Sequence, residues 1–152
     1  MSETTTVLNS TLLPLKDKTL LVPEQAVAAI IPFSQLLTTA SNKKWLLGRI
    51  EWHGQAVPVI CYEKLNNDLN PAPNLNSRFA LFNTVERHSK LPYYAMLIQD
   101  APRACPLEEK QLSQLETGIT GEYDACSVSI AQNIVAVIPD LDKLEATLLA
   151  ML

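Results

Sequence analysis

The stretch WLLGRIEWHGQAVPVICYEKL, Trp45–Leu65, decides the fold of this chain. Each half of it repeats apolar side chains with the two-residue period of a β-strand, first at Leu46, Gly48, Ile50 and Trp52 and then at Val57, Val59 and Cys61. His53-Gly54 separates the halves, and a two-residue X-Gly break between alternating runs predicts a β-hairpin. Gly54 is expected to supply a positive φ in that turn, because glycine has no Cβ to clash there.

Other strand-like runs lie on both sides of this hairpin. The expected strands are Thr11–Leu15, Thr19–Val22, Ala26–Ile31, Arg78–Val85, Tyr93–Gln99, Asp124–Ile130 and Ile134–Ile138. Residues 1–10 are expected to form a flexible tail, and Pro106 is expected to open a short helix through about Thr117. A terminal helix should follow Asp140 or Asp142 as its N-cap and bury a stripe of leucines. The sum is a mainly β fold, a barrel or sandwich, with one terminal helix.

Composition narrows the class of protein. The chain has 152 residues, enough for about one domain, and with 47% hydrophobic and 18% charged residues it is too apolar to be disordered. A net charge of -4 without a basic block argues against nucleic acid and against anionic membranes as partners. The polar start lacks the pattern of a signal peptide, and no apolar run approaches the ~20 residues of a membrane span.

The cysteines indicate a reducing compartment. Cys61, Cys105 and Cys126 are odd in number, widely spaced and form no Cys-x-x-Cys pair, so buried free thiols are expected. We therefore expect a cytoplasmic protein.

Catalytic machinery is not visible in the sequence. His53 falls at the hairpin tip and His88 in a polar segment, and no nucleophile-elbow or zinc-protease motif is present. We predict no enzyme, with no catalytic, metal-binding or cofactor-binding residue. Trp45 is out of phase with the strand, and an exposed apolar patch around it would be a partner site. Two alternatives stay open: a small β-barrel that binds a small molecule in a roomy apolar pocket, and an enzyme built on a Cys105 thiol of lowered pKa or on the His53 region.

The central stretch resembles the signature of CheW-like chemotaxis adaptors. That pattern is an apolar pair, Gly, a strand, Arg-Gly, then Pro-Val and a leucine-bearing turn, and here the matching residues are Gly48, Gly54, Pro58-Val59 and Leu65. Weaker matches follow the family's order along the chain: Val27–Ile30, Tyr94–Pro102 with Asp100, and Ile138–Leu144.

The resemblance implies two five-stranded β-barrel subdomains, intertwined in a single domain over residues 11–152, and no active site. Members of the family bridge the cytoplasmic tip of a methyl-accepting chemoreceptor and the regulatory domain of a CheA-type histidine kinase. Partner contacts are then expected along the hairpin and an earlier strand, at Val27, Ala29, Ile30, Trp45, Gly48, His53, Gly54, Val57, Pro58 and Val59. No cofactor, nucleic acid or membrane insertion is implied.

Two positions depart from the family pattern. His53 stands where the family has Arg, and Ala29 stands where it has the acid of its Val-x-Glu strand. Both partners of an ion pair near the receptor-binding surface are thus replaced together, which leaves no buried charge unpaired and affects receptor contact more than folding. The chain is similar in this respect to divergent adaptors, such as the ChpC-like accessory proteins of type IV pilus systems that control twitching motility.

Overall fold

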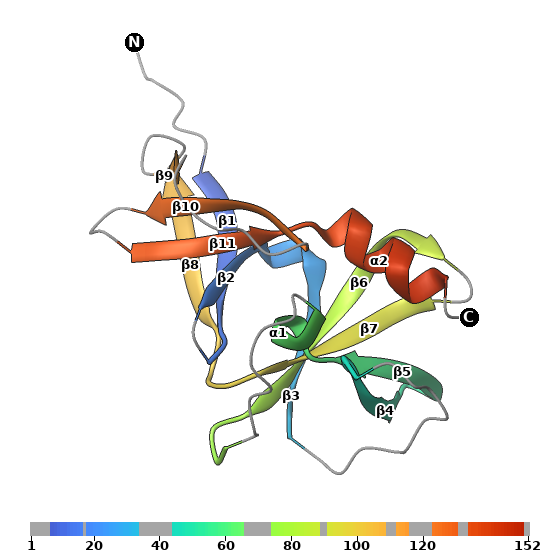
Figure 1. Cartoon of the computed structure of the whole chain (residues 1–152). Helices are drawn as coiled ribbons and strands as arrows, with labels where there is room; N and C mark the ends of the chain where they lie inside the picture. Colours follow the sequence, from blue (N-terminus) through green and yellow to red (C-terminus); the bar gives the residue numbers. More distant parts are fainter. Residues whose placement is uncertain are drawn as a thin grey trace.

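Alternating apolar residues build two β-sheets in the computed structural model (Figure 1). The described residues are 7–16, 18–33, 44–65, 74–88, 91–108, 112–115, 123–130 and 134–150. One sheet is built from both ends of the chain and the other from its middle, so the chain leaves the first sheet and returns to it.

The first sheet has six strands in the order β8-β1-β2-β11-β10-β9. These strands span Val7–Pro14 (β1), Thr19–Pro23 (β2), Arg103–Glu108 (β8), Leu112–Leu115 (β9), Asp124–Ile130 (β10) and Ile134–Pro139 (β11). All neighbours are antiparallel except β11 and β2, which pair in parallel at Val137 and Leu20.

The second sheet has five strands in the order β3-β6-β7-β5-β4. They span Val27–Pro32 (β3), Leu46–Trp52 (β4), Gln55–Ile60 (β5), Arg78–His88 (β6) and Leu91–Ile98 (β7). The β5–β7 pair is parallel and the other pairs are antiparallel. The described residues thus give β3 and β4 a neighbour on one side each, so both are edge strands of this sheet.

The described segments also contain three short helices: η1 (Glu24–Ala26), α1 (Tyr62–Leu65) and α2 (Leu141–Leu149). The N-cap of α2 is Asp140, whose Oδ1 accepts a hydrogen bond from the Lys143 backbone N–H at 3.0 Å. Asp142 lies in the first turn of the helix, where its charge favours the helix dipole. Leu144 and Leu148 are buried, as the leucine stripe predicted.

Three apolar clusters hold the sheets. The shared core joins both sheets and α2, with Leu13, Leu20, Ile60, Phe82, Met96 and Leu144 among its buried members. The second core lies within the five-stranded sheet, where Phe79 and Leu81 of β6 alternate with Ala80 and Phe82 of the shared core. The third core lies within the six-stranded sheet and includes Leu21, Leu107 and Val128. Successive side chains of β6 point to opposite faces of the strand, so this strand contributes to both cores.

The predicted mainly β fold with two sheets and a short C-terminal helix is confirmed. The hairpin is confirmed as β4 and β5, and Cys61 is a buried free thiol. The first sheet has six strands because the short strand β9 is added to its edge, beside β10.

Several expectations are wrong in detail. The helix expected from Pro106 is strand β8, because Leu107 enters the third core and the backbone of this segment pairs with β1. Strand β1 begins at Val7, not near Thr11, so residues 7–10 belong to the sheet and not to a tail. Strand β6 continues to His88, which pairs with Leu91 across its hairpin, so the segment expected to be a loop is part of the strand.

Candidate interaction surface

The tip of the β4–β5 hairpin is a tight turn exposed to solvent. Trp52 pairs with Gln55, and the two residues between them have positive φ angles, 49° at His53 and 75° at Gly54. Two consecutive positive φ values are the mark of a type I′ turn, whose twist matches that of the flanking strands. Both turn residues are exposed, so the hairpin presents its tip to whatever approaches this end of the sheet.

An aromatic cluster supports this tip. The His53 imidazole stacks on the Trp52 indole, with centroids 3.8 Å apart and an interplanar angle of 12°. Tyr93 of β7 meets the other side of the cluster edge-on, 5.0 Å from the Trp52 ring at 82°. Trp52 also packs against the second core, as its phase in the strand predicted. Stacking orders the His53 side chain, so the tip displays a fixed aromatic surface.

Strand β4 leaves a free edge beside this tip. Gly48 and Ile50 are buried, whereas Arg49 and Glu51 are exposed on the opposite face. An edge strand carries backbone N–H and C=O groups without a neighbouring strand, and charges of this kind protect it from unspecific pairing. A partner that adds a strand here would meet both signs of charge.

Strand β3 forms the other edge of the same sheet. Val27, Ala29 and Ile30 are all half-buried. Val27 and Ile30 pack against the shared core and Ala29 packs against the second core. A register shift between Val27 and Ala29 places these neighbours on different clusters. The exposed parts of these three side chains are apolar, so this edge of the sheet is suited to contact with a partner.

Some residues expected to contact a partner are core residues. Val57 is 1% exposed and Val59 0% exposed, and both fill the second core, so neither side chain is available to a partner. Gly48 is buried and Pro58 is half-buried. The phase of Trp45 suggested an exposed side chain, but the structure shows it half-buried against the shared core. Its carbonyl accepts a hydrogen bond from the Cys61 N–H at 2.8 Å.

Exposed apolar side chains that the sequence analysis did not single out lie elsewhere. Phe33 is 42% exposed just after β3, with its ring 5.3 Å from that of Phe79, and Ile134 and Val135 are 42% and 58% exposed at the start of β11. The sequence did hold a signal for these exposed side chains. Phe33 lies just outside a strand, and Ile134 and Val135 are two large apolar residues in succession at the start of one.

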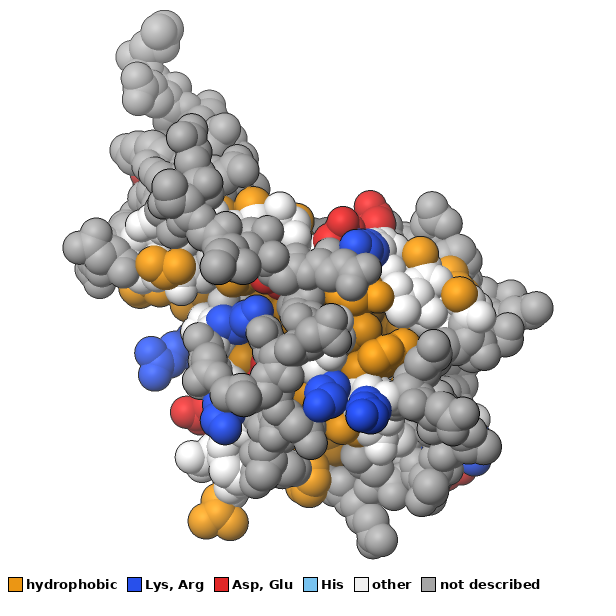
Figure 2. Space-filling view, in the orientation of Figure 1, with side chains coloured by type: hydrophobic (Ala, Val, Ile, Leu, Met, Phe, Trp, Pro, Cys, Tyr) orange, Lys and Arg blue, Asp and Glu red, His pale blue; other side chains and the backbone are white. Residues whose placement is uncertain are grey.

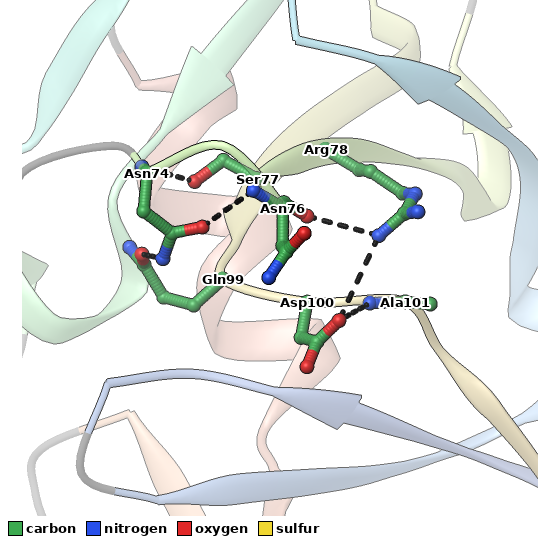
Figure 3. Close-up of polar contacts among 7 residues, drawn as sticks. All are labelled: Asn74, Asn76, Ser77, Arg78, Gln99, Asp100 and Ala101. Carbon is green, nitrogen blue, oxygen red and sulfur yellow. Dashed lines mark hydrogen bonds and ion pairs between the residues drawn. The ribbon is translucent and has the colours of Figure 1, made fainter.

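A polar network lies where β6 begins and β7 ends (Figure 3). The Asn74 amide donates to Gln99 Oε1 at 2.8 Å, and the Arg78 guanidinium donates to the Asn76 carbonyl at 2.9 Å and lies 3.9 Å from Asp100. Asp100 also accepts the Ala101 N–H at 2.7 Å. Asp100 therefore anchors the exit from β7 and the path to β8, which is a structural role.

The Cys61 and Cys105 thiols are held in their protonated form. Burial raises the pKa of the Cys61 thiol, and burial likewise raises the pKa of the Cys105 thiol. An enzyme built on Cys105 was expected to have a thiol of lowered pKa, and the raised pKa argues against this alternative. The His88 side chain lies outside the described residues.

Within the described parts of the chain, no group of three or more His, Cys, Asp or Glu side chains is placed to hold a metal ion. The interior of the five-stranded sheet is occupied by side chains of the second core, including Phe79, Leu81 and Leu97, where the ligand-binding alternative expected a roomy pocket. Among the described residues no helix combines the length and the hydropathy needed to cross a bilayer.

Comparisons with known proteins agree with this architecture. The family model described as the CheW-like domain matches residues 11–147. Among solved structures, the scaffolding protein TtCheW from Thermoanaerobacter tengcongensis matches with a TM-score of 0.75 and 11% sequence identity, over 88% of this chain and 89% of that chain. No curated protein matches the sequence significantly. The structural likeness shows the fold, and the family match spans strands of both sheets.

Proposed function

Because the chain belongs to the CheW-like domain family, we propose that it is a non-catalytic adaptor that couples a methyl-accepting chemoreceptor to a CheA-type histidine kinase in the cytoplasm. The observation that carries the proposal is the family match over residues 11–147, which includes both sheets and the hairpin. An adaptor works by presenting surfaces to two partners, and the described five-stranded sheet offers its edge strands β3 and β4 and an ordered aromatic tip.

The hairpin tip is the surface we assign to the receptor. The resemblance puts an ion pair of the family, near its receptor-binding surface, at the positions of His53 and Ala29. In this chain the two positions belong to opposite edges of the five-stranded sheet, His53 at the tip next to β4 and Ala29 in β3. His53 stacks on Trp52, so the tip offers the receptor an aromatic contact in place of a charged one. Such a contact gains from desolvation of the rings and depends less on salt than an exposed ion pair does.

The kinase contact is assigned to the apolar strand β3 and the adjoining exposed face. Val27, Ala29 and Ile30 are each half-buried, and Phe33 follows them with 42% of its surface exposed. Transient signalling interfaces bury on the order of 1,200 Å² or less, which an edge strand and its flanking residues can supply.

A more specific assignment follows from the two departures. A chain that lacks both members of the family's ion pair fits an accessory adaptor, and we place it with the ChpC-like branch that serves type IV pilus twitching motility. Kinase, receptor and pilus genes beside the coding gene would support this branch, whereas a flagellar operon would oppose it.

Titration of this chain into a receptor tip and into a kinase regulatory domain tests the proposal. His53→Gly keeps the turn, since glycine accepts the positive φ, but removes the imidazole that stacks on Trp52. We expect receptor affinity to fall about fivefold, the effect of losing one ordered side chain at the edge of an interface. Kinase affinity should stay unchanged.

Arg103→Ala on β8 is the matched control, because this exposed residue lies in the other sheet. A loss of receptor binding equal to that of His53→Gly would show that the tip is not the contact. If the unaltered chain bound neither partner at high micromolar concentrations, the adaptor function itself would be refuted.

A further inference from the structure

Lysines gather around α1, at the place where the two sheets meet. Lys64 belongs to α1, and Lys18 lies with its Nζ 5.8 Å from the centre of the Tyr62 ring in the same helix. Lys16 shares the β1–β2 turn with Lys18, which is closed by a 2.8 Å hydrogen bond from the Leu15 N–H to the Lys18 carbonyl. Lys44 precedes Trp45, and the Trp45 carbonyl accepts a hydrogen bond from the N–H of Cys61, the residue just before α1. We call Lys16, Lys18, Lys44 and Lys64 the basic patch.

Helix α1 is a fixed platform for this patch. Tyr62 is fully buried, and its hydroxyl lies within hydrogen-bond distance of the Tyr123 carbonyl, at 2.9 Å, and of the Asp124 carboxylate, at 2.5 Å. Since Tyr123 and Asp124 lie at the start of β10, these contacts tie α1 to the six-stranded sheet. Lys64 is therefore carried by a helix that is held in place, which lowers the entropy lost when a partner binds to it.

Among the described residues, two acidic groups next to these lysines are withdrawn from the surface. Glu63 of α1 is 4% exposed, and the side chain of Asp124 is 2% exposed with Lys18 at 3.6 Å. Lys16 and Lys44 are exposed, and Lys64 is half-buried. Figure 2 shows blue Lys and Arg side chains gathered around the region of α1 and the β1–β2 turn.

We propose that the basic patch is a docking site for a carboxylate-rich segment of a protein partner. The proposal goes beyond the adaptor function and rests on it only for the identity of the natural partner. The patch is opposite in sign to the chain as a whole, which carries a net charge of -4, so it singles out one face for an acidic partner.

A protein is a better occupant than a nucleic acid or a membrane. A long polyanion such as a phosphate backbone extends beyond the patch, where the net charge of -4 would repel it. A short acidic segment of a protein covers only the patch and avoids this repulsion.

The location adds a geometric consequence. Lys16 and Lys18 extend from the six-stranded sheet, and Lys44 and Lys64 flank the ends of strands in the five-stranded sheet. A partner on the patch therefore touches both sheets at their junction, away from the hairpin tip assigned to the receptor. The affinity of a partner docked there would depend on how the two sheets are placed relative to one another.

A titration of the labelled full chain with a hexaglutamate peptide, followed by NMR amide shifts in 50 mM salt, tests the proposal. Shifts should concentrate at the basic patch and at α1. The combined variant Lys44→Glu/Lys64→Glu should weaken peptide binding about tenfold at this low salt, with the difference shrinking above 300 mM. Lys18 is left in place because it pairs with the buried Asp124 carboxylate.

The single variants Lys44→Glu and Lys64→Glu are compared with Lys143→Glu on α2, which reverses the same charge outside the patch and should leave peptide binding unchanged. Shifts spread equally over all surface lysines, or an equal effect of the control, would overturn the proposal. So would tighter binding of a DNA duplex or of phosphatidylserine vesicles than of the peptide in the same buffer.

Titrations with the kinase regulatory domain and the receptor tip then separate this proposal from the adaptor function. If the partners bind, the Lys44→Glu/Lys64→Glu variant should weaken at least one of them about tenfold in 50 mM salt. Unchanged binding of both would overturn the docking site and leave the adaptor function standing. Failure of both partners to bind, with peptide shifts confined to the patch, would refute the adaptor function and support the docking site.

Discussion

Replacing Gly54 by alanine should lower the free energy of unfolding by about 1 kcal/mol, and the structure fixes each part of that number. Gly54 has φ +75°, and an alanine held in this left-handed region costs about 1–2 kcal/mol. A Cβ built there meets nothing within 4 Å, so no steric term is added. Alanine also restricts the unfolded chain, which returns about 0.4–1 kcal/mol.

Urea unfolding of the two proteins, followed by tryptophan fluorescence, measures this difference. For a chain of this length the corresponding fall in melting temperature is about 3 °C. Gly54→Asn is the control, because asparagine enters the left-handed region more readily than alanine and should lose less stability. An unchanged unfolding free energy, or equal losses for the two variants, would refute the assignment of the turn.

Three further predictions concern other contacts. Tyr62→Phe should lower the free energy of unfolding by about 2 kcal/mol in urea titrations, because the buried Asp124 carboxylate loses the tyrosine hydroxyl; a loss below 0.5 kcal/mol would contradict this contact. Asp140→Ala should cost about 1 kcal/mol by removing the cap of α2, and Asp140→Ser should recover most of it. Burial raises the pKa of Cys61 above its ordinary value of 9.0, so above about pH 9 the native state keeps a proton that the unfolded state loses. The free energy of unfolding should therefore be constant below about pH 9 and fall as the pH rises further. Urea titrations across this range should show a smaller fall for Cys61→Ala.

The alternating pattern was enough to predict the hairpin but not its detailed faces. Leu46 was placed on the same face as Ile50, yet it packs against the shared core while Ile50 lies in the second core. The cause is a register shift between Leu46 and Gly48, which inserts Leu47 as an extra residue in β4. A bulge of this kind depends on pairing with β5, and the periodicity of one strand cannot reveal it.

Tertiary pairing also overruled local signals at Pro106. A proline followed by acidic residues is a reasonable helix start, but this segment lies beside β1 and sends Leu107 into the third core. Trp45 was misplaced for a related reason, since the shared core that covers it is assembled from residues far apart in the sequence. Burial that depends on distant strands is the part of the fold that local patterns leave open.

The candidate surface was predictable only in part. The turn at His53-Gly54 followed from the X-Gly break, whereas the stack of His53 on Trp52 and the edge-on contact from Tyr93 depend on the three-dimensional arrangement of β4 and β7. The basic patch was invisible for the same reason. Its lysines come from three separate segments, and the sequence shows no block of positive charge among them.

Isothermal titration of the full chain into a CheA-type regulatory domain, and separately into a chemoreceptor tip, tests the central claim most directly. The adaptor function predicts saturable binding with a dissociation constant on the order of 1–100 µM for at least one of them, as suits a transient signalling contact. Heats that never exceed those of dilution, with both partners folded and at high micromolar concentration, would contradict it.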